Sequence, residues 1–108
     1  MSVLAVYTYT VKAERYNDQF AFIEKVKDFA KRRPELFKGV KSYRFFSKLA
    51  GGKFGDFVEM LEYDSLADLE KGYAEGMQDK EYLETIYPDI VALTIPGTFG
   101  MEIWNTVP

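Results

Sequence analysis

The feature that most constrains the fold is a strand–helix–strand pattern that occurs twice, in residues 3–49 and again in residues 54–107. Residues 3–12, 40–49, 54–63 and 98–107 are rich in Val, Tyr, Phe and Thr, which are typical of β-strands. Apolar residues recur with the helical period in residues 16–33 and in a longer, broken stretch over residues 65–93. This order predicts an α+β protein with one four-stranded antiparallel sheet, strand order 4-1-3-2, and helices on one face.

Local signals predict where these elements end. Pro34 ends the first helix, because a residue that precedes proline avoids the α-helical region. Ser65 is a suitable N-cap for the second helical stretch, with Asp68 three residues later, and Pro88 interrupts that stretch. Residues 50–53 contain paired glycines, which indicate a short hairpin turn between the second and third strands.

The size and charge of the chain limit its class. A chain of 108 residues that is 47% hydrophobic is expected to form one domain over residues 1–108. Its net charge of −3 repels phosphate backbones, so we expect no nucleic-acid partner. No apolar run reaches the roughly 18 residues of a membrane span, and the N-terminal residues lack a basic leader. We therefore expect a cytoplasmic protein with no membrane partner.

The sequence contains neither Cys nor His, which narrows the chemistry. The absence of Cys excludes disulfides and thiol nucleophiles, and the absence of His removes the commonest general base and metal ligand. Motifs for zinc sites, nucleophile triads and phosphate loops are also missing from the sequence. We expect no metal and no cofactor, and the sequence identifies no catalytic residue.

The predicted sheet is apolar on both faces, whereas one layer of helices can cover only one of them. In the first strand, one side carries Val3, Ala5, Tyr7, Tyr9 and Val11, and the other carries Leu4, Val6, Thr8 and Thr10. Four strands of about ten residues leave an open face of about 600 Å². Burial of a wholly apolar face of that size is worth up to ~15 kcal/mol. We therefore expect a homodimer in which a second copy covers this face.

Three segments resemble the dimeric α+β barrel proteins, a ferredoxin-like superfamily that includes the antibiotic-biosynthesis monooxygenases. They are residues 39–46 (GVKSYRFF), 57–66 (FVEMLEYDSL) and 97–104 (GTFGMEIW), and the resemblance extends over the whole chain. It implies a ferredoxin-like βαββαβ domain whose sheet forms a barrel with that of a second subunit. In the monooxygenases of this group the substrate supplies the electrons, so neither His nor a metal is required. The haem-degrading members use a histidine that this chain lacks.

Four residues on the strands are candidates for ligand binding. Tyr43, Arg44, Trp104 and Asn105 are side chains that could orient a phenol or stabilise its anion. The many tyrosines suggest a cavity between helices and sheet that holds an aromatic ligand, although ordinary packing explains them as well. Arg44 and Glu102 lie on opposite edge strands, so they cannot meet within one subunit. They are predicted to pair across the dimer interface, unless both head groups simply reach solvent.

Residues 53–60 (KFGDFVEM) resemble the signature of RNA-recognition motifs. That signature needs two stacking aromatics two residues apart, whereas Phe54 and Phe57 are three apart and fall on opposite faces of a regular strand. Asp56 and Glu59 also add negative charge where phosphates would lie. Packing is therefore the favoured interpretation of this segment.

Two functions of different classes follow. The first is a homodimer that binds a small aromatic or apolar molecule and, as the resemblance implies, acts as a cofactor-independent monooxygenase-like enzyme. The alternative is a non-catalytic dimerisation or ligand-sensing module. RNA binding through the third strand is the least favoured.

Overall fold

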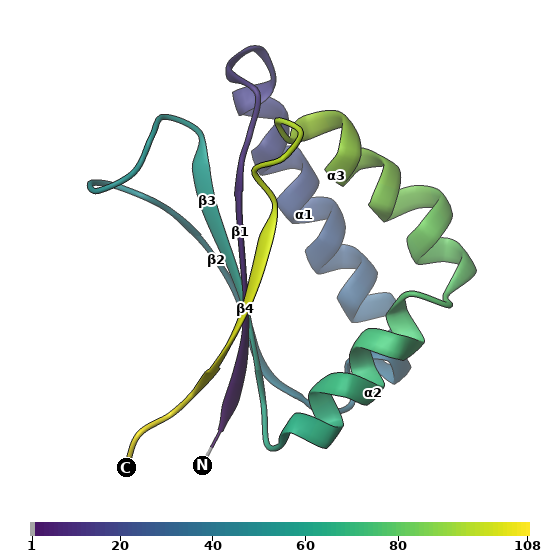
Figure 1. The fold of residues 1–108 in the computed structure, drawn as a ribbon. Coiled ribbons are helices and arrows are strands. Elements are labelled where there is room, and N and C mark those ends of the chain that lie inside the picture. Colours follow the sequence, from purple (N-terminus) through teal and green to yellow (C-terminus); the bar gives the residue numbers. More distant parts are fainter. Residues whose placement is uncertain (1) are drawn as a thin grey trace.

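A computed structural model describes residues 2–108 and shows one open sheet covered by helices on a single face (Figure 1). The strands are β1 (Val3–Thr10), β2 (Val40–Ser47), β3 (Asp56–Tyr63) and β4 (Gly100–Asn105). The helices are α1 (Tyr16–Arg32), α2 (Leu66–Gly76) and α3 (Tyr87–Leu93), with shorter turns η1 (Ala13–Arg15), η2 (Pro34–Phe37) and η3 (Tyr82–Ile86). All strand pairs are antiparallel and the order is β2-β3-β1-β4. This is the predicted 4-1-3-2 order read from the other edge, so the predicted fold class is confirmed.

The strands are shorter than the sequence predicts. β2 ends at Ser47, β3 begins at Asp56 and β4 covers only Gly100–Asn105, so the link between β2 and β3 is a wide loop and not a four-residue turn. Directly before β3, Gly55 has a φ of +90°, and its carbonyl accepts a hydrogen bond from the Val11 amide. A Cβ at position 55 would lie 2.6 Å from the Val11 carbonyl oxygen, so only glycine fits this crossing without strain.

The second helical stretch is broken, as predicted, and its start is confirmed. The Ser65 hydroxyl accepts a hydrogen bond from the Asp68 amide at 3.1 Å, which caps α2. The interruption expected at Pro88 takes the form of the π-helical turn η3, which precedes α3 directly. Proline cannot donate to the preceding turn, and a widened turn accommodates the missing hydrogen bond. No helix among residues 2–108 is both long and apolar enough to cross a bilayer.

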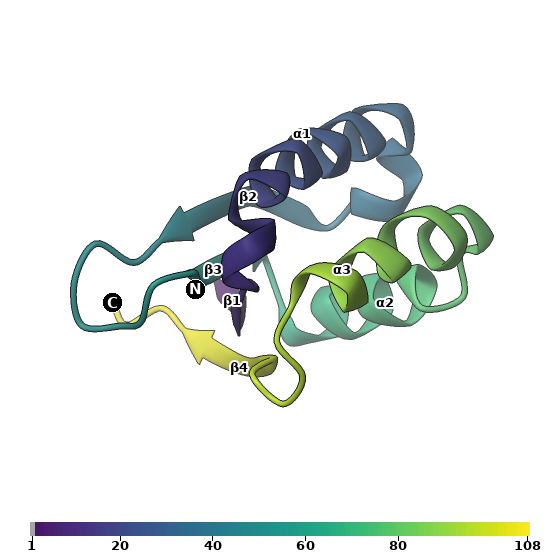
Figure 2. The same cartoon turned by 90° about the horizontal axis from the view of Figure 1, so that it is seen from above.

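The core lies between the sheet and the helices. Seen from above, α1 lies on the side of β2, and α2 and α3 lie on the side of β4 (Figure 2). The strands contribute every second side chain to this layer, as the pleat of a sheet requires. Its buried apolar side chains include Ala5, Tyr9, Phe22, Val26, Phe29, Phe57, Leu61, Leu69, Ile86 and Leu93.

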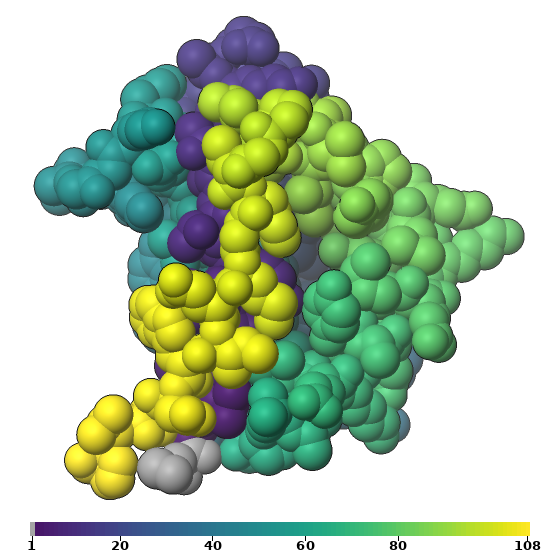
Figure 3. Space-filling model, in the orientation of Figure 1, coloured from purple at the N-terminus to yellow at the C-terminus, as the bar shows by residue number. Residues whose placement is uncertain are grey.

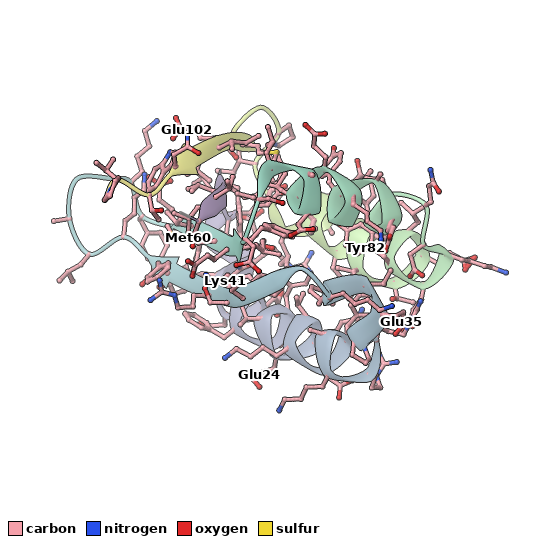
Figure 4. The ribbon with its side chains drawn as sticks, turned by 90° about the horizontal axis from the view of Figure 1, so that it is seen from below. Glu24, Glu35, Lys41, Met60, Tyr82 and Glu102 are labelled. Atoms are coloured by element: carbon pink, nitrogen blue, oxygen red, sulfur yellow. The ribbon has the colours of Figure 1, made fainter. Side chains whose placement is uncertain are left out.

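The other face of the sheet carries no helix (Figure 1). Val6 lies in its middle and is buried, with Met60 and Glu102 as its cross-strand neighbours. Figure 4 labels these two neighbours. Phe46 on β2 and Trp104 on β4 lie near the opposite edges of this face and are 40% and 45% exposed. The open face predicted from the sequence is therefore present, although the shorter strands make it smaller.

Candidate ligand pocket around Glu59

Strand β3 places a carboxyl group on the face that carries the helices. Glu59 is opposite Tyr7 of β1 and Phe45 of β2, and residues directly opposite each other in an antiparallel sheet share a face. Phe57 and Leu61, two residues away on either side, are buried in the same layer. The strand thus brings one ionisable side chain into the middle of an apolar layer.

Burial changes the ionisation of this carboxyl group. Removal from water disfavours the charged form and raises the pKa of Glu59 to about 7 from its ordinary value of 4.5. The Tyr43 hydroxyl donates a hydrogen bond to Glu59 Oε1, which acts in the opposite direction by stabilising the carboxylate. Near neutral pH, both the acid and the carboxylate are therefore populated.

Tyrosine side chains from several elements surround Glu59. Burial, and then the charge of Glu59, raises the pKa of each of these phenols, to about 12 for Tyr82. They therefore remain neutral hydroxyl groups at neutral pH, and Glu59 is the one member of this cluster that titrates there. The other members are Tyr7, Tyr9, Tyr43 and Tyr63. Figure 4 shows Tyr82 in the helical layer.

A small pocket adjoins this cluster, between β1, β3, α1 and the end of α3. It encloses about 230 Å³, including solvent at its mouth, and its interior has room for about one water molecule. Its lining residues are Tyr9, Gln19, Phe22, Glu59, Ile90, Leu93, Thr94 and Phe99. In Figure 3 the surface is also hollowed between β4 and the helical layer.

Gln19 is the second polar residue at this pocket. It lies on α1, is 1% exposed, and its Nε2 atom donates a hydrogen bond to the Tyr9 hydroxyl at 2.7 Å. Within residues 2–108, its Oε1 atom has no hydrogen-bond partner. A buried acceptor without a partner costs about 1–3 kcal/mol, so this atom marks a place for a donor from a ligand or a water molecule.

A charged groove lies on the outer side of the same wall. Phe22 and Leu93 line both the pocket and this groove, so they separate Glu59 from the surface between α1 and α3. Across the groove, Lys25 Nζ donates to the Thr85 carbonyl at 2.7 Å and to Asp89 Oδ2 at 2.8 Å. These bonds tie α1 to η3 and α3 above the pocket.

The four residues proposed from the sequence for ligand binding do not meet within one chain. Tyr43 lies on the helix face and contacts Glu59, whereas Arg44, beside it in β2, lies on the open face with its guanidinium 5.4 Å from the centre of the Phe46 ring. Trp104 lies near the opposite edge of that open face. Asn105 ends β4, opposite Val3 and on the helix side of the sheet.

Glu102 also lies on the open face, where it accepts a hydrogen bond from Trp104 Nε1 at 3.0 Å. Arg44 and Glu102 occupy opposite edge strands, as the sequence predicts, and the pairing across a dimer stays a prediction.

Sequence reasoning did not single out Glu59 and Gln19 as site residues, although a signal exists for both. Glu59 shares its face with Phe57 and Leu61 by the period of two. Gln19 precedes Phe22 and Val26 by three and seven residues, so it interrupts the apolar stripe of α1. In each case a polar residue occupies a position that the pattern assigns to the core.

The resemblance of residues 53–60 to an RNA-binding signature loses its support in the structure. Phe57 is 1% exposed beneath the helices, and Phe54 lies outside β3, where its ring stacks on Tyr16 at 4.7 Å. Neither ring is on the open face of the sheet, where such a signature stacks bases.

Comparison with known proteins identifies the fold. No protein-family model and no curated protein matches the chain. Among solved structures, a NIPSNAP family protein from Agrobacterium tumefaciens has a TM-score of 0.75 at 14% identity and covers 99% of this chain and 94% of its own. An antibiotic biosynthesis monooxygenase has a TM-score of 0.69 at 16% identity, with coverage of 98% and 99%. The chain has the ferredoxin-like α+β fold of these proteins.

A third similar structure is SnoaB, a cofactor-independent oxygenase from Streptomyces nogalater. Its TM-score is 0.68 at 14% identity, and the match covers 97% of this chain and 92% of SnoaB. The resemblance found in the sequence is thus confirmed at the level of the fold. Because the identities are low, they carry no residue role from those proteins to this one.

Proposed function

We propose that this chain forms a homodimeric α+β barrel and binds a small aromatic molecule in the pocket beside Glu59. The observation that supports this proposal is the pocket itself. Its walls are apolar, with Phe22, Leu93 and Phe99 among them, and its polar groups converge at Glu59 and Gln19. Apolar walls with a few converging polar groups are typical of small-molecule sites.

Binding of a whole aromatic ring requires the pocket to widen, because its interior has room for about one water molecule. Phe99 is the side chain best placed to move. It is half exposed, lies just before β4, and rests on Tyr7 and Tyr9 with ring centres 5.7 and 6.1 Å apart. A ligand ring would take its place against these two tyrosines.

The candidate reaction is oxygenation of a phenolic ligand without a bound cofactor. In such a reaction the substrate supplies the electrons, one oxygen atom enters the product, and the other leaves as water. Glu59 could accept the phenol proton, since its carboxylate is populated near pH 7. Tyr43 would hold that carboxylate in place through its hydrogen bond. The alternative function is ligand sensing, in which the same pocket binds without reaction.

An oxygen-uptake experiment separates these two functions. A dihydroxynaphthalene is incubated with the protein under ¹⁸O₂, and the product is analysed by mass spectrometry against a sample without protein. We expect protein-dependent uptake with one ¹⁸O atom per product and a loss of at least about tenfold in rate for Glu59→Gln. Glu62→Gln is the matched control, because Glu62 lies on the same strand but on the open face. Binding without uptake supports the sensing function.

Arg44, Trp104 and Asn105 remain proposed ligand-binding residues of the dimer. If two open faces packed against each other, Arg44 and Trp104 would lie inside the barrel. The Glu59 pocket lies on the other face of the sheet. Arg44→Ala tests this in the same oxygen assay. An unchanged rate, together with an unchanged affinity for the probe, would remove Arg44 from the ligand site.

A further inference from the structure

Several polar groups at the pocket keep hydrogen-bonding capacity that a ligand could use. Thr94 has already donated its hydroxyl proton to the Ile90 carbonyl, at 2.7 Å. Gln19 has used Nε2 on Tyr9, and its Oε1 is free, as is the Glu59 carboxyl oxygen that does not receive the Tyr43 hydrogen bond. The Tyr9 hydroxyl accepts from Gln19 and retains one proton to donate.

No cation balances these acceptors at the pocket. Its lining residues, all within the described part of the chain, include no Lys and no Arg. Arg15 and Lys25 line the outer groove beyond Phe22 and Leu93, and both are paired there with aspartates. A carboxylate or phosphate in the pocket would therefore meet Glu59 without a compensating charge.

We propose that Gln19 and Glu59 determine the specificity of this pocket: Gln19 Oε1 accepts a hydrogen bond from a hydroxyl group of a neutral ligand, and Glu59 excludes anionic ligands. A hydroxyl group both donates and accepts, so it can satisfy Gln19 Oε1 and receive the proton of Tyr9. An ether on the same ring can only accept and leaves Gln19 Oε1 unpaired. This inference rests on the proposed binding function and names the polar group that the pocket selects.

The exclusion of anions is expected to depend on pH through Glu59 alone. The titratable groups that face Glu59 are tyrosines from β1, β2, β3 and η3, and all of them stay protonated well above neutral pH. The side chains of α1 and α3 at the pocket do not ionise, and Asp18 and Asp89 lie on the groove side of the wall. The pKa of Glu59 is about 7, so repulsion appears as the pH rises through that value.

Three probes of one ring size test the proposal: phenol, anisole and benzoate. Their dissociation constants are measured by ¹H–¹⁵N NMR titration of the whole chain at pH 5.5 and pH 8. We expect phenol to bind about tenfold more tightly than anisole, and Gln19→Met to remove that preference. Benzoate is expected to bind about tenfold more weakly at pH 8 than at pH 5.5, while phenol changes little. Glu59→Gln should remove this pH dependence, and Glu62→Gln should retain it.

The outcomes separate the parts of the proposal. Equal affinities of the wild-type chain for phenol and anisole overturn the role of Gln19. This comparison uses the wild-type chain alone, so it does not depend on whether a variant folds. Benzoate binding that is the same at both pH values overturns the role of Glu59. If none of the three probes shifts resonances of the pocket residues, the proposed binding function itself is wrong, and the specificity falls with it.

Discussion

A half-buried carboxyl group in an apolar layer makes the free energy of unfolding depend on pH, and Glu59 is such a group. Its pKa rises from 4.5 to about 7 on folding, so the native state binds more protons than the unfolded state between these values. The contribution of Glu59 to stability is therefore highest below pH 4.5 and is lost as the pH rises through 7. The shift in the pKa of Glu59 corresponds to a loss of ~3 kcal/mol in the free energy of unfolding, an upper limit because the side chain is partly exposed.

Replacement of Glu59 by Gln tests this loss of stability at high pH. Gln cannot ionise but can still accept the hydrogen bond from Tyr43, so we expect Glu59→Gln to be about as stable as the wild type at pH 5. At pH 8 the variant should be more stable by about 2 kcal/mol. Urea unfolding at the two pH values measures both differences. Glu62→Gln is the control, since a hydrogen bond involving Ser2 lowers the pKa of Glu62 and predicts the opposite sign. Parallel pH profiles for the wild type and Glu59→Gln would contradict the prediction.

For single residues, the sequence indicates which side chains need a partner but not which partner they find. A tyrosine on an apolar strand needs a polar partner, and the Tyr43 hydroxyl finds it in Glu59, whereas the ligand-binding role of Tyr43 stays a prediction. The assignment of a face to Arg44 or Trp104 depends on register. A β-bulge between Val40 and Ser42 shifts that register in β2, and the residue pattern does not reveal it.

At the scale of elements, the junction between α2 and η3 depends on one aspartate. Asp79 Oδ2 accepts a hydrogen bond from the Tyr82 amide at 2.9 Å, and its carboxylate also binds the Arg33 guanidinium at 2.6 Å. Arg33 further pairs with Glu35 and Glu81, so the end of α1 is held against the start of the broken helix. The hydrogen bonds with Arg33 lower the pKa of Asp79, which keeps it ionised at neutral pH.

Two variants of Asp79 separate the cap from the ion pair. Asp79→Asn retains an oxygen that can accept from the Tyr82 amide but loses the charge, whereas Asp79→Ala loses both. We expect Asp79→Ala to be less stable than Asp79→Asn by about 1 kcal/mol, the usual contribution of an N-cap, in urea unfolding at pH 7. Amide exchange in residues 82–86 should rise more for Ala than for Asn. Equal stability of the two variants would mean that the cap contributes nothing here.

The elements themselves are predictable from the sequence because their signals are local. Ser65, Pro34 and the apolar periods mark their places, and the structure agrees with them. The strand ends are not predictable in the same way. The loop before β3 is set by the approach of Gly55 to Val11, two residues that are distant in sequence. The sequence likewise indicates only an interruption near Pro88 and does not show that it takes the π-helical form of η3.

For the whole molecule, the proposed dimer depends on the open face. Strands of six to eight residues give an open face of about 500 Å². Two such faces packed together would bury about 1,000 Å² in total, near the lower limit for a specific interface. The charges near the edges are complementary, with Arg44 on β2 and Glu102 on β4. A two-fold arrangement that brings β2 of one copy near β4 of the other forms this pair twice.

A charge exchange therefore tests the dimer and the pair together. Arg44→Glu and Glu102→Arg each replace two attractive contacts by two repulsive ones, at about 1 kcal/mol per contact. We expect each variant to raise the dissociation constant of the dimer about 30-fold, which corresponds to ~2 kcal/mol. The double variant restores opposite charges and should regain most of the affinity, because the effects of paired residues are not additive. Analytical ultracentrifugation over a concentration series measures all four proteins. A wild-type chain that stays monomeric refutes the dimer, and a double variant as weak as the singles refutes the pair while the dimer stands.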